Sequence, residues 1–147
     1  MDDRPLQPLA TRDSWQAVAP RSMAPIPYRA TFSEQEYDVI RRGLVPVEME
    51  DRWFIFWEEA SLFVHRSWTG FCVYQVAFQV TANSAAVISA TVCTDATQYH
   101  RGSDQYEVAF LDSLIRGALL QQAVRFPEPE RRRGSRLCST LKRWFGS

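Results

Sequence analysis

Residues 53–74 read WFIFWEEASLFVHRSWTGFCVY, and this stretch decides the fold. Two runs rich in aromatic and β-branched residues flank Glu59-Ala60-Ser61, and the second run ends at Trp68-Thr69-Gly70. Such runs favour β-strands, and connections this short join antiparallel neighbours. Gly70 suits the left-handed position of a three-residue hairpin loop. The stretch therefore predicts an aromatic β-hairpin that continues into a third strand.

The hairpin is expected to belong to a four-stranded antiparallel meander. Composition and turn residues place the strands at about 52–58, 62–67, 71–81 and 86–94, with a turn at Asn83-Ser84. The connections are too short for the crossovers that parallel strands need.

Two helices are predicted beside these strands. Ser33 and Glu36 form a capping box ahead of a short helix over about 34–42. Ser103 is a suitable N-cap for a longer helix, about 104–124, with one apolar side. The predicted fold class is α+β: the meander, a short N-terminal helix, and a long C-terminal helix packed on the sheet.

The chain of 147 residues is long enough for one domain with its own core. Five prolines before residue 28 indicate an extended or disordered arm over residues 1–27. The α+β domain is expected at 28–126. Residues 127–147 read as a basic tail with a short amphipathic helix.

Charge is unevenly distributed along the chain. Residues 1–130 hold eleven basic and all seventeen acidic residues, a net charge of −6, whereas residues 131–147 carry +6. Arg131-Arg132-Arg133 could contact nucleic acid or an anionic membrane, or form a solvated linker. The acidic body counts against nucleic acid as the partner.

The sequence indicates no metal site, cofactor or membrane span. Its three cysteines, Cys72, Cys93 and Cys138, form no close pair, and only His65 and His100 could join them as zinc ligands. Free thiols in a reducing compartment are expected. No signal-peptide pattern and no apolar run of membrane-spanning length occurs, so a cytoplasmic location is expected.

The two faces of the predicted hairpin are both apolar. Centring the loops on Ala60 and Thr69 predicts the register of the strands. One face, expected to be the core, then carries Phe54, Phe56, Leu62, Val64, Tyr74, Val76 and Phe78. The other carries Trp53, Ile55, Trp57, Phe63, His65, Ser67 and Val73. The second face must be covered, either by the protein's own arm and terminal segments or by a partner or ligand.

His65 and Arg66 form the densest polar cluster on the predicted sheet. His65 is either a general base or donor in a site, or a hydrogen-bonded structural residue. Arg66 either donates a bidentate pair of hydrogen bonds to a phosphate or carboxylate of a ligand, or forms an ion pair with a strand carboxylate such as Glu58. Glu58 and Glu59 belong to a group of carboxylates that would attract a basic partner. No catalytic residue is assigned, because no recognised catalytic motif frames these side chains.

The hairpin resembles a small uncharacterised bacterial module. Its members carry a W-F-I-[YF] strand followed by F-H-R-S-W-T-G, which corresponds here to Trp53-Phe54-Ile55-Phe56 and to Phe63 through Gly70, with Val64 before His65. The similarity covers about residues 50–80. The resemblance implies an association with ADP-ribosylglycohydrolase and macrodomain proteins and with toxin or defence gene neighbourhoods. It supplies no catalytic residue.

Two functional hypotheses follow. The first is a non-catalytic interaction protein of the immunity or antitoxin kind, which binds and occludes a bacterial toxin such as an ADP-ribosyltransferase. The alternative is an ADP-ribose- or nucleotide-binding module, or an enzyme of ADP-ribose metabolism. The residues expected to contact the partner or ligand are Trp53, Trp57, Glu58, Glu59, Phe63, His65, Arg66 and Trp68.

Overall fold

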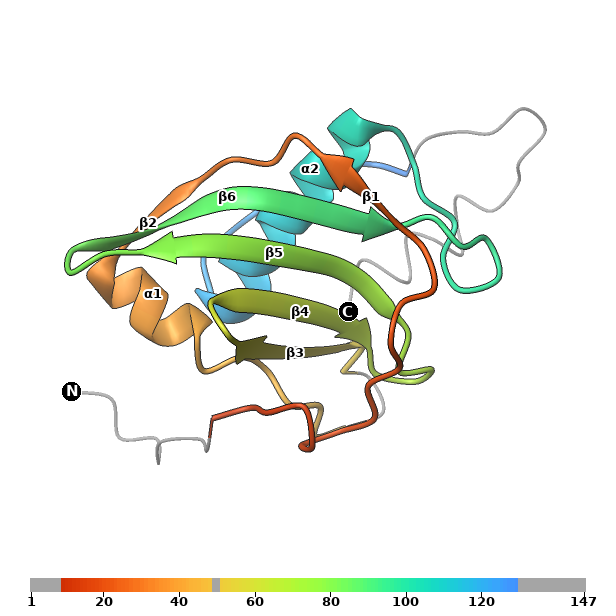
Figure 1. Cartoon of the computed structure of the whole chain (residues 1–147), viewed down its shortest axis with the longest axis horizontal. Helices are drawn as coiled ribbons and strands as arrows, with labels where there is room; N and C mark the ends of the chain where they lie inside the picture. Colours follow the sequence, from red (N-terminus) through yellow and green to blue (C-terminus); the bar gives the residue numbers. More distant parts are fainter. Residues whose placement is uncertain (1–8, 49–50, 130–147) are drawn as a thin grey trace.

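The computed structural model describes residues 9–48 and 51–129 (Figure 1). The predicted amphipathic segment in the basic tail, and most of that tail, lie outside these residues. The described part is a mostly-sheet α+β fold of two layers, in which one antiparallel sheet packs against a helix.

Six strands form the sheet in the described part of the chain, in the order β1-β6-β5-β4-β3, with β2 also paired to β6. Their bounds are β1 Met23–Ile26, β2 Thr31–Ser33, β3 Trp53–Glu58, β4 Ser61–Arg66, β5 Cys72–Val80 and β6 Ser84–Cys93. The prediction of four strands was wrong, because β1 and β2 both add to the outer edge of β6. These two strands have four and three residues, too few to show an alternating pattern, and β1 contains Pro25.

The short helix α1, Glu34–Ile40, begins as predicted. The Glu36 backbone N–H donates to Ser33 Oγ at 3.1 Å, and the Ser33 N–H donates to Glu36 Oε1 at 2.9 Å. This reciprocal pair satisfies two donors that the helix itself leaves unpaired.

The second helix is shorter than predicted. α2, Asp104–Leu114, continues into a π-helical turn, η1, Ile115–Leu119, so the helical segment has 16 residues and ends before residue 124. Gln121 has a positive φ of 57°, and the chain reverses there. A Cβ on Gly117 would lie 2.7 Å from a methyl group of Val124, so this glycine lets the returning segment pack against the helix. The apolar residues after the helix therefore pack beside it and do not extend it.

The register of the first hairpin differs from the prediction by one residue. Glu58 pairs with Ser61, so the loop has two residues, Glu59 and Ala60, with φ values of 51° and 59° as in a type I′ turn. A slip of one residue moves every side chain of a strand to the opposite face. Phe54 and Phe56 consequently face away from α2, whereas β3 presents Trp53, Ile55 and Trp57 toward it.

The second hairpin has the predicted register, with Leu62 opposite Val76 and Val64 opposite Tyr74. A bulge follows at Val64/His65, and Val73 joins the main core, contrary to the prediction that it lies on the second face. A bulge adds one residue to a strand and re-aims its side chain.

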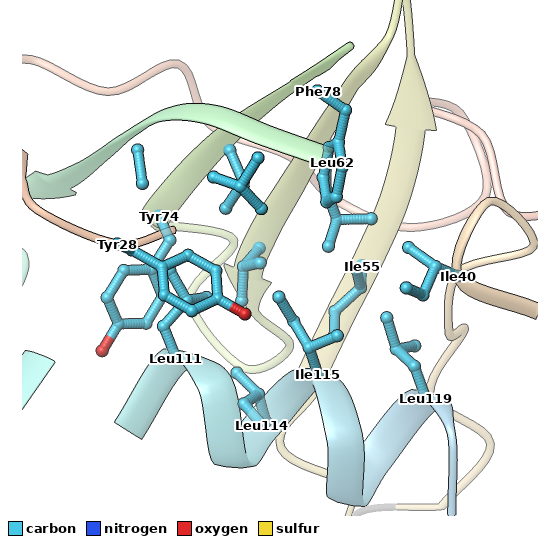
Figure 2. Close-up of a cluster of buried hydrophobic side chains, with 14 of the residues drawn as sticks. Tyr28, Ile40, Ile55, Leu62, Tyr74, Phe78, Leu111, Leu114, Ile115 and Leu119 are labelled. Atoms are coloured by element: carbon cyan, nitrogen blue, oxygen red, sulfur yellow. The ribbon is translucent and has the colours of Figure 1, made fainter. Parts of the chain in front are cut away.

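The main core lies between the sheet and α2. In Figure 2, Leu111, Leu114, Ile115 and Leu119 point from the helical segment toward sheet residues such as Ile55 and Leu62. α1 adds Ile40, and the chain before β2 adds Tyr28, whose hydroxyl donates to Asp112 Oδ1 at 2.8 Å. This core covers one face of the sheet, and residues from the N-terminal part of the chain pack on the opposite face.

Candidate functional site

The arm, residues 9–22, crosses the β3–β4 half of the face opposite α2. Ala10 packs with Phe54 and Phe56, both of which are fully buried. The guanidinium carbon of Arg12 lies 5.0 Å from the ring centre of Phe56 and 5.2 Å from that of Phe63. Arg12 also donates through two nitrogens to the Glu58 carboxylate, both at 3.2 Å. The protein's own arm therefore covers this part of the second face.

His65 lies beneath the arm with only 1% of its surface exposed. Its Nδ1 is 2.8 Å from the carbonyl oxygen of Gly70, and its ring stacks on Phe56 with centres 5.4 Å apart. Nε2 has no hydrogen-bond partner. Burial lowers the pKa of His65; the charge of Arg12 lowers it further, and the hydrogen bond to Gly70 opposes this. His65 is therefore a neutral residue that holds the β4–β5 loop.

Arg66, the next residue of β4, lies on the opposite face. Its guanidinium carbon is 5.4 Å from the ring centre of Trp53 and 5.6 Å from that of Tyr99, between the sheet and α2. Burial lowers the pKa of Arg66. His65 and Arg66 are thus adjacent in sequence but do not converge on one site.

A buried carboxylate near Arg66 escaped the sequence analysis. Glu107 of α2 is fully buried and accepts hydrogen bonds from the Tyr74 hydroxyl at 2.5 Å, the Tyr99 hydroxyl at 2.9 Å and the Gly102 N–H at 2.7 Å. Burial raises the pKa of both tyrosines, so their hydroxyls remain protonated donors. The sequence held one signal of this burial. Glu107 precedes the apolar residues Phe110 and Leu111 by three and four positions, so the three side chains lie on the same side of the helix.

Four of the eight large apolar side chains that are exposed among the described residues lie at the end of the sheet that holds the β4–β5 loop. We call this group the turn-end surface; its members are Trp15, Val18, Val47 and Trp68. Trp68 is 62% exposed and Val47 81% exposed. The guanidinium of Arg52 lies 5.6 Å from the ring centre of Trp68. A contiguous apolar patch is a candidate interaction site, whereas single exposed apolar residues are common on protein surfaces.

Hydrogen bonds from the arm fix the two tryptophans relative to one another. Trp15 Nε1 donates to the Ser67 carbonyl at 2.8 Å, and Gln16 Nε2 donates to the carbonyls of Ser67 and Trp68 at 2.9 and 3.0 Å. The Val18 N–H donates to Gly70 O at 2.8 Å. The arm therefore completes the turn-end surface and holds the loop that carries Trp68.

The loop before β3 joins the same assembly. The Ser67 hydroxyl donates to Asp51 O at 2.6 Å, and the Asp51 carboxylate accepts the Val47 N–H at 2.9 Å. Ser67 thus serves as a structural anchor between three chain segments.

The predicted site residues are divided between the two faces. Trp53 packs on Phe110, with ring centres 6.0 Å apart, and Trp57 packs on Phe78, with ring centres 5.1 Å apart; both are half-buried on the α2 side. Phe63 and Glu58 lie under Arg12 on the other side, and Glu59 is exposed in the β3–β4 turn. Of the predicted set, Trp68 alone belongs to the turn-end surface, which also includes residues that the sequence analysis did not select.

Among the described residues, no three His, Cys, Asp or Glu side chains are arranged to hold a metal ion. Cys72 and Cys93 are buried free thiols, and burial raises the pKa of Cys72 to about 12. No helix in the described ranges is long and apolar enough to cross a bilayer.

Comparisons of the chain with protein-family models, with curated proteins and with solved structures find no match.

Proposed function

We propose that the protein is a non-catalytic binding protein of the immunity or antitoxin kind, which binds a bacterial toxin and occludes its active cleft. The turn-end surface is the observation that carries this proposal. It presents two tryptophans and two valines on a backbone tied together by the arm. Tryptophan is enriched among the residues that contribute most to protein–protein binding.

The turn-end surface is preorganised for binding. Trp15 and Trp68 are linked through the Ser67 and Trp68 carbonyls, so little loop entropy remains to be lost on association. Fixing a binding loop before contact strengthens binding for this reason. A rigid, exposed aromatic pair is suited to insertion into a cleft on a partner.

Charge supports a basic partner. Asp13, Glu48 and Glu59 are exposed carboxylates, and residues 1–130 carry a net charge of −6. Complementary charge speeds association and suppresses wrong partners. The hairpin resembles modules that are associated with toxin gene neighbourhoods. We therefore propose that the partner is a toxin, with an ADP-ribosyltransferase as the first candidate.

The buried ionisable groups favour binding over catalysis. His65 and Glu107 lie out of contact with solvent and are committed to internal hydrogen bonds. A general base must reach the proton that it removes from a substrate. The alternative nucleotide site gains less support, since His65, Arg66 and Trp68 lie in three separate surroundings.

The test is co-expression with the toxin encoded by the neighbouring gene, followed by measurement of growth protection and of Kd. Trp68→Ala and Trp15→Ala should each weaken binding at least about tenfold and reduce protection. Val39→Ala removes an exposed apolar side chain from α1 and should change neither. If the wild-type protein neither binds nor protects, the proposal fails. Binding of ADP-ribose that is lost in Trp68→Ala would favour the alternative.

A further inference from the structure

The arm lies on the sheet as a mostly exposed segment with one buried anchor. Ala10 is buried, and every other residue of the arm is at least partly exposed. Ala10 and Ala17 pack with the buried phenylalanines of β3. The ring centre of His65 lies 6.0 Å and 5.4 Å from those of Phe54 and Phe56, in the same cluster. A segment with few buried contacts opens at a lower cost than the whole fold. The arm can therefore leave His65 while the main core stays folded.

His65 and the arm share one acceptor, the carbonyl oxygen of Gly70. His65 Nδ1 and the Val18 N–H both bond to it. A Cβ on Gly70 would lie 3.1 Å from Gln16 Cγ and 3.2 Å from Val18 Cγ2, so the arm packs directly on this loop. A carbonyl oxygen only accepts hydrogen bonds, so Nδ1 already carries its hydrogen and a second proton must go to Nε2. Nε2 is buried and has no partner among the described residues. Protonation would therefore leave a charged N–H without an acceptor beneath the arm.

The titratable and charged groups that face His65 also oppose a second proton. The arm contributes the cation of Arg12, and β3 contributes Glu58, which is bound to Arg12. β5 places Cys72 opposite His65, and burial raises the pKa of this thiol to about 12, so it is neutral. Burial lowers the pKa of His65; the hydrogen bond to Gly70 opposes this, and the charge of Arg12 lowers the pKa further. Detachment of the arm would give the ring water and remove Arg12, which relieves both causes.

We propose that mild acid detaches the arm from the sheet through protonation of His65, and that the turn-end surface is dismantled with it. Trp15 and Val18, two of the four members of this surface, belong to the arm. The loop that carries Trp68 would also lose the hydrogen bonds donated by Trp15 and Gln16. The consequence, release of the toxin in acid, rests on the proposed function. The movement of the arm needs no partner and can be measured without one.

Proton linkage sets the size of the effect. With the arm detached, the pKa of His65 returns to its ordinary value of 6.5, whereas the docked arm holds this pKa lower. Each pH unit from 6.5 down to the docked pKa therefore raises the ratio of detached to docked arm by up to about tenfold. Above pH 6.5 the ratio is constant, because His65 is neutral in both states.

Hydrogen exchange of the full chain, between about pH 7.5 and 5 and corrected for intrinsic exchange rates, is the direct test. The amides of Ala10 and Val18 donate to the carbonyls of Arg42 and Gly70, so their protection reports docking of the arm. This protection should be constant above pH 6.5 and fall by up to about tenfold per pH unit below it. Dilute urea separates local from global opening. Local detachment exposes little surface, so urea should hardly change exchange in the arm, whereas it should accelerate exchange in α2.

The two histidines of the chain provide a matched pair of variants. His65→Gln cannot titrate and should keep the arm protected in acid. His100→Gln removes the exposed histidine before α2 and should lose protection like wild type. If His65→Gln does not fold, the wild-type imidazole serves instead. The NMR signal of His65, identified as the one that remains in His100→Gln, should titrate in step with the loss of arm protection.

Three results would overturn the proposal: an arm that stays protected in acid, an equal loss in His65→Gln, or an arm that exchanges together with α2 at every urea concentration. For the toxin, Kd should weaken in acid in proportion to the fall in the docked fraction, and Kd of His65→Gln should not change. Equal affinity of the wild type at both pH values, with a detached arm, would overturn the regulatory role. If no toxin binds at any pH while the arm still detaches, the proposed function alone fails.

Discussion

The carbonyl oxygen of Gly70 accepts a hydrogen bond from His65 Nδ1 at 2.8 Å. The same oxygen accepts the backbone N–H of Val18, also at 2.8 Å. One atom thus joins β4, the loop that presents Trp68, and the arm. Because the other ring nitrogen of His65 has no partner, the ring fits this position only when neutral.

Stability should therefore fall in mild acid. Since burial lowers the pKa of His65 below its unfolded value of 6.5, the residue contributes stability above that pH. This contribution is lost as pH falls from 6.5 toward the lower folded pKa, at up to about 1.4 kcal/mol per pH unit. Urea unfolding at several pH values between 7.5 and 5 measures the effect. His65→Gln cannot titrate and should show a flatter profile over this window, whereas equal slopes for the two proteins would exclude His65 as the cause.

Two substitutions in the β3–β4 turn should stabilise the folded protein. Glu59 and Ala60 both have positive φ, which costs about 1 kcal/mol at a residue with a side chain. Glu59→Asn with Ala60→Gly supplies the residues that type I′ turns prefer, and should raise the free energy of unfolding by about 1 kcal/mol. Urea denaturation at neutral pH measures the change. Ala77→Gly, in the interior of β5, is the control and should destabilise the protein.

The same turn explains why the hairpin was predicted correctly from the sequence whereas the two faces of β3 were assigned the wrong way round. The aromatic run of β3 and its return in β4 were evident from composition, and so was the cap of α1, because Ser33 and Glu36 interact within one turn. The sequence Glu-Ala is not a usual two-residue turn, so the loop was expected to have three residues. That single residue reversed the faces of β3.

The candidate site depends on contacts that sequence reading does not reveal. Trp15 and Ser67 are 52 residues apart, and nothing in either neighbourhood identifies the other as its partner. His65 and Arg66 look like one polar cluster when read along the chain, but alternation along β4 separates them. The strands β1 and β2 are likewise defined by pairing with β6 more than by their own residues.

Glu107 should be among the most sensitive positions for stability. Glu107→Ala would leave the hydroxyls of Tyr74 and Tyr99 and the Gly102 N–H without their acceptor, and should cost about 3 kcal/mol or more of unfolding free energy. Tyr99→Phe removes one donor and should cost about 1 kcal/mol. Chemical denaturation compares both with Glu128→Ala, a surface change near the end of the described chain. A loss below 1 kcal/mol for Glu107→Ala would mean that the network contributes little.

Arg12 should control how firmly the arm is docked. It lies over Phe56 and Phe63 and binds Glu58, but both partners of the ion pair are nearly half-exposed, so Arg12→Ala should cost only about 1 kcal/mol. The loss should be local. In hydrogen exchange measured by mass spectrometry, the amide of Val18 should exchange faster while α2 is unchanged. Arg21→Ala removes a looser ion pair, 3.8 Å long, and should leave the Val18 amide protected. If Arg12→Ala exchanges like wild type, the hydrogen bonds of Trp15 and Gln16 suffice to hold the arm, and binding through the turn-end surface should then be insensitive to Arg12.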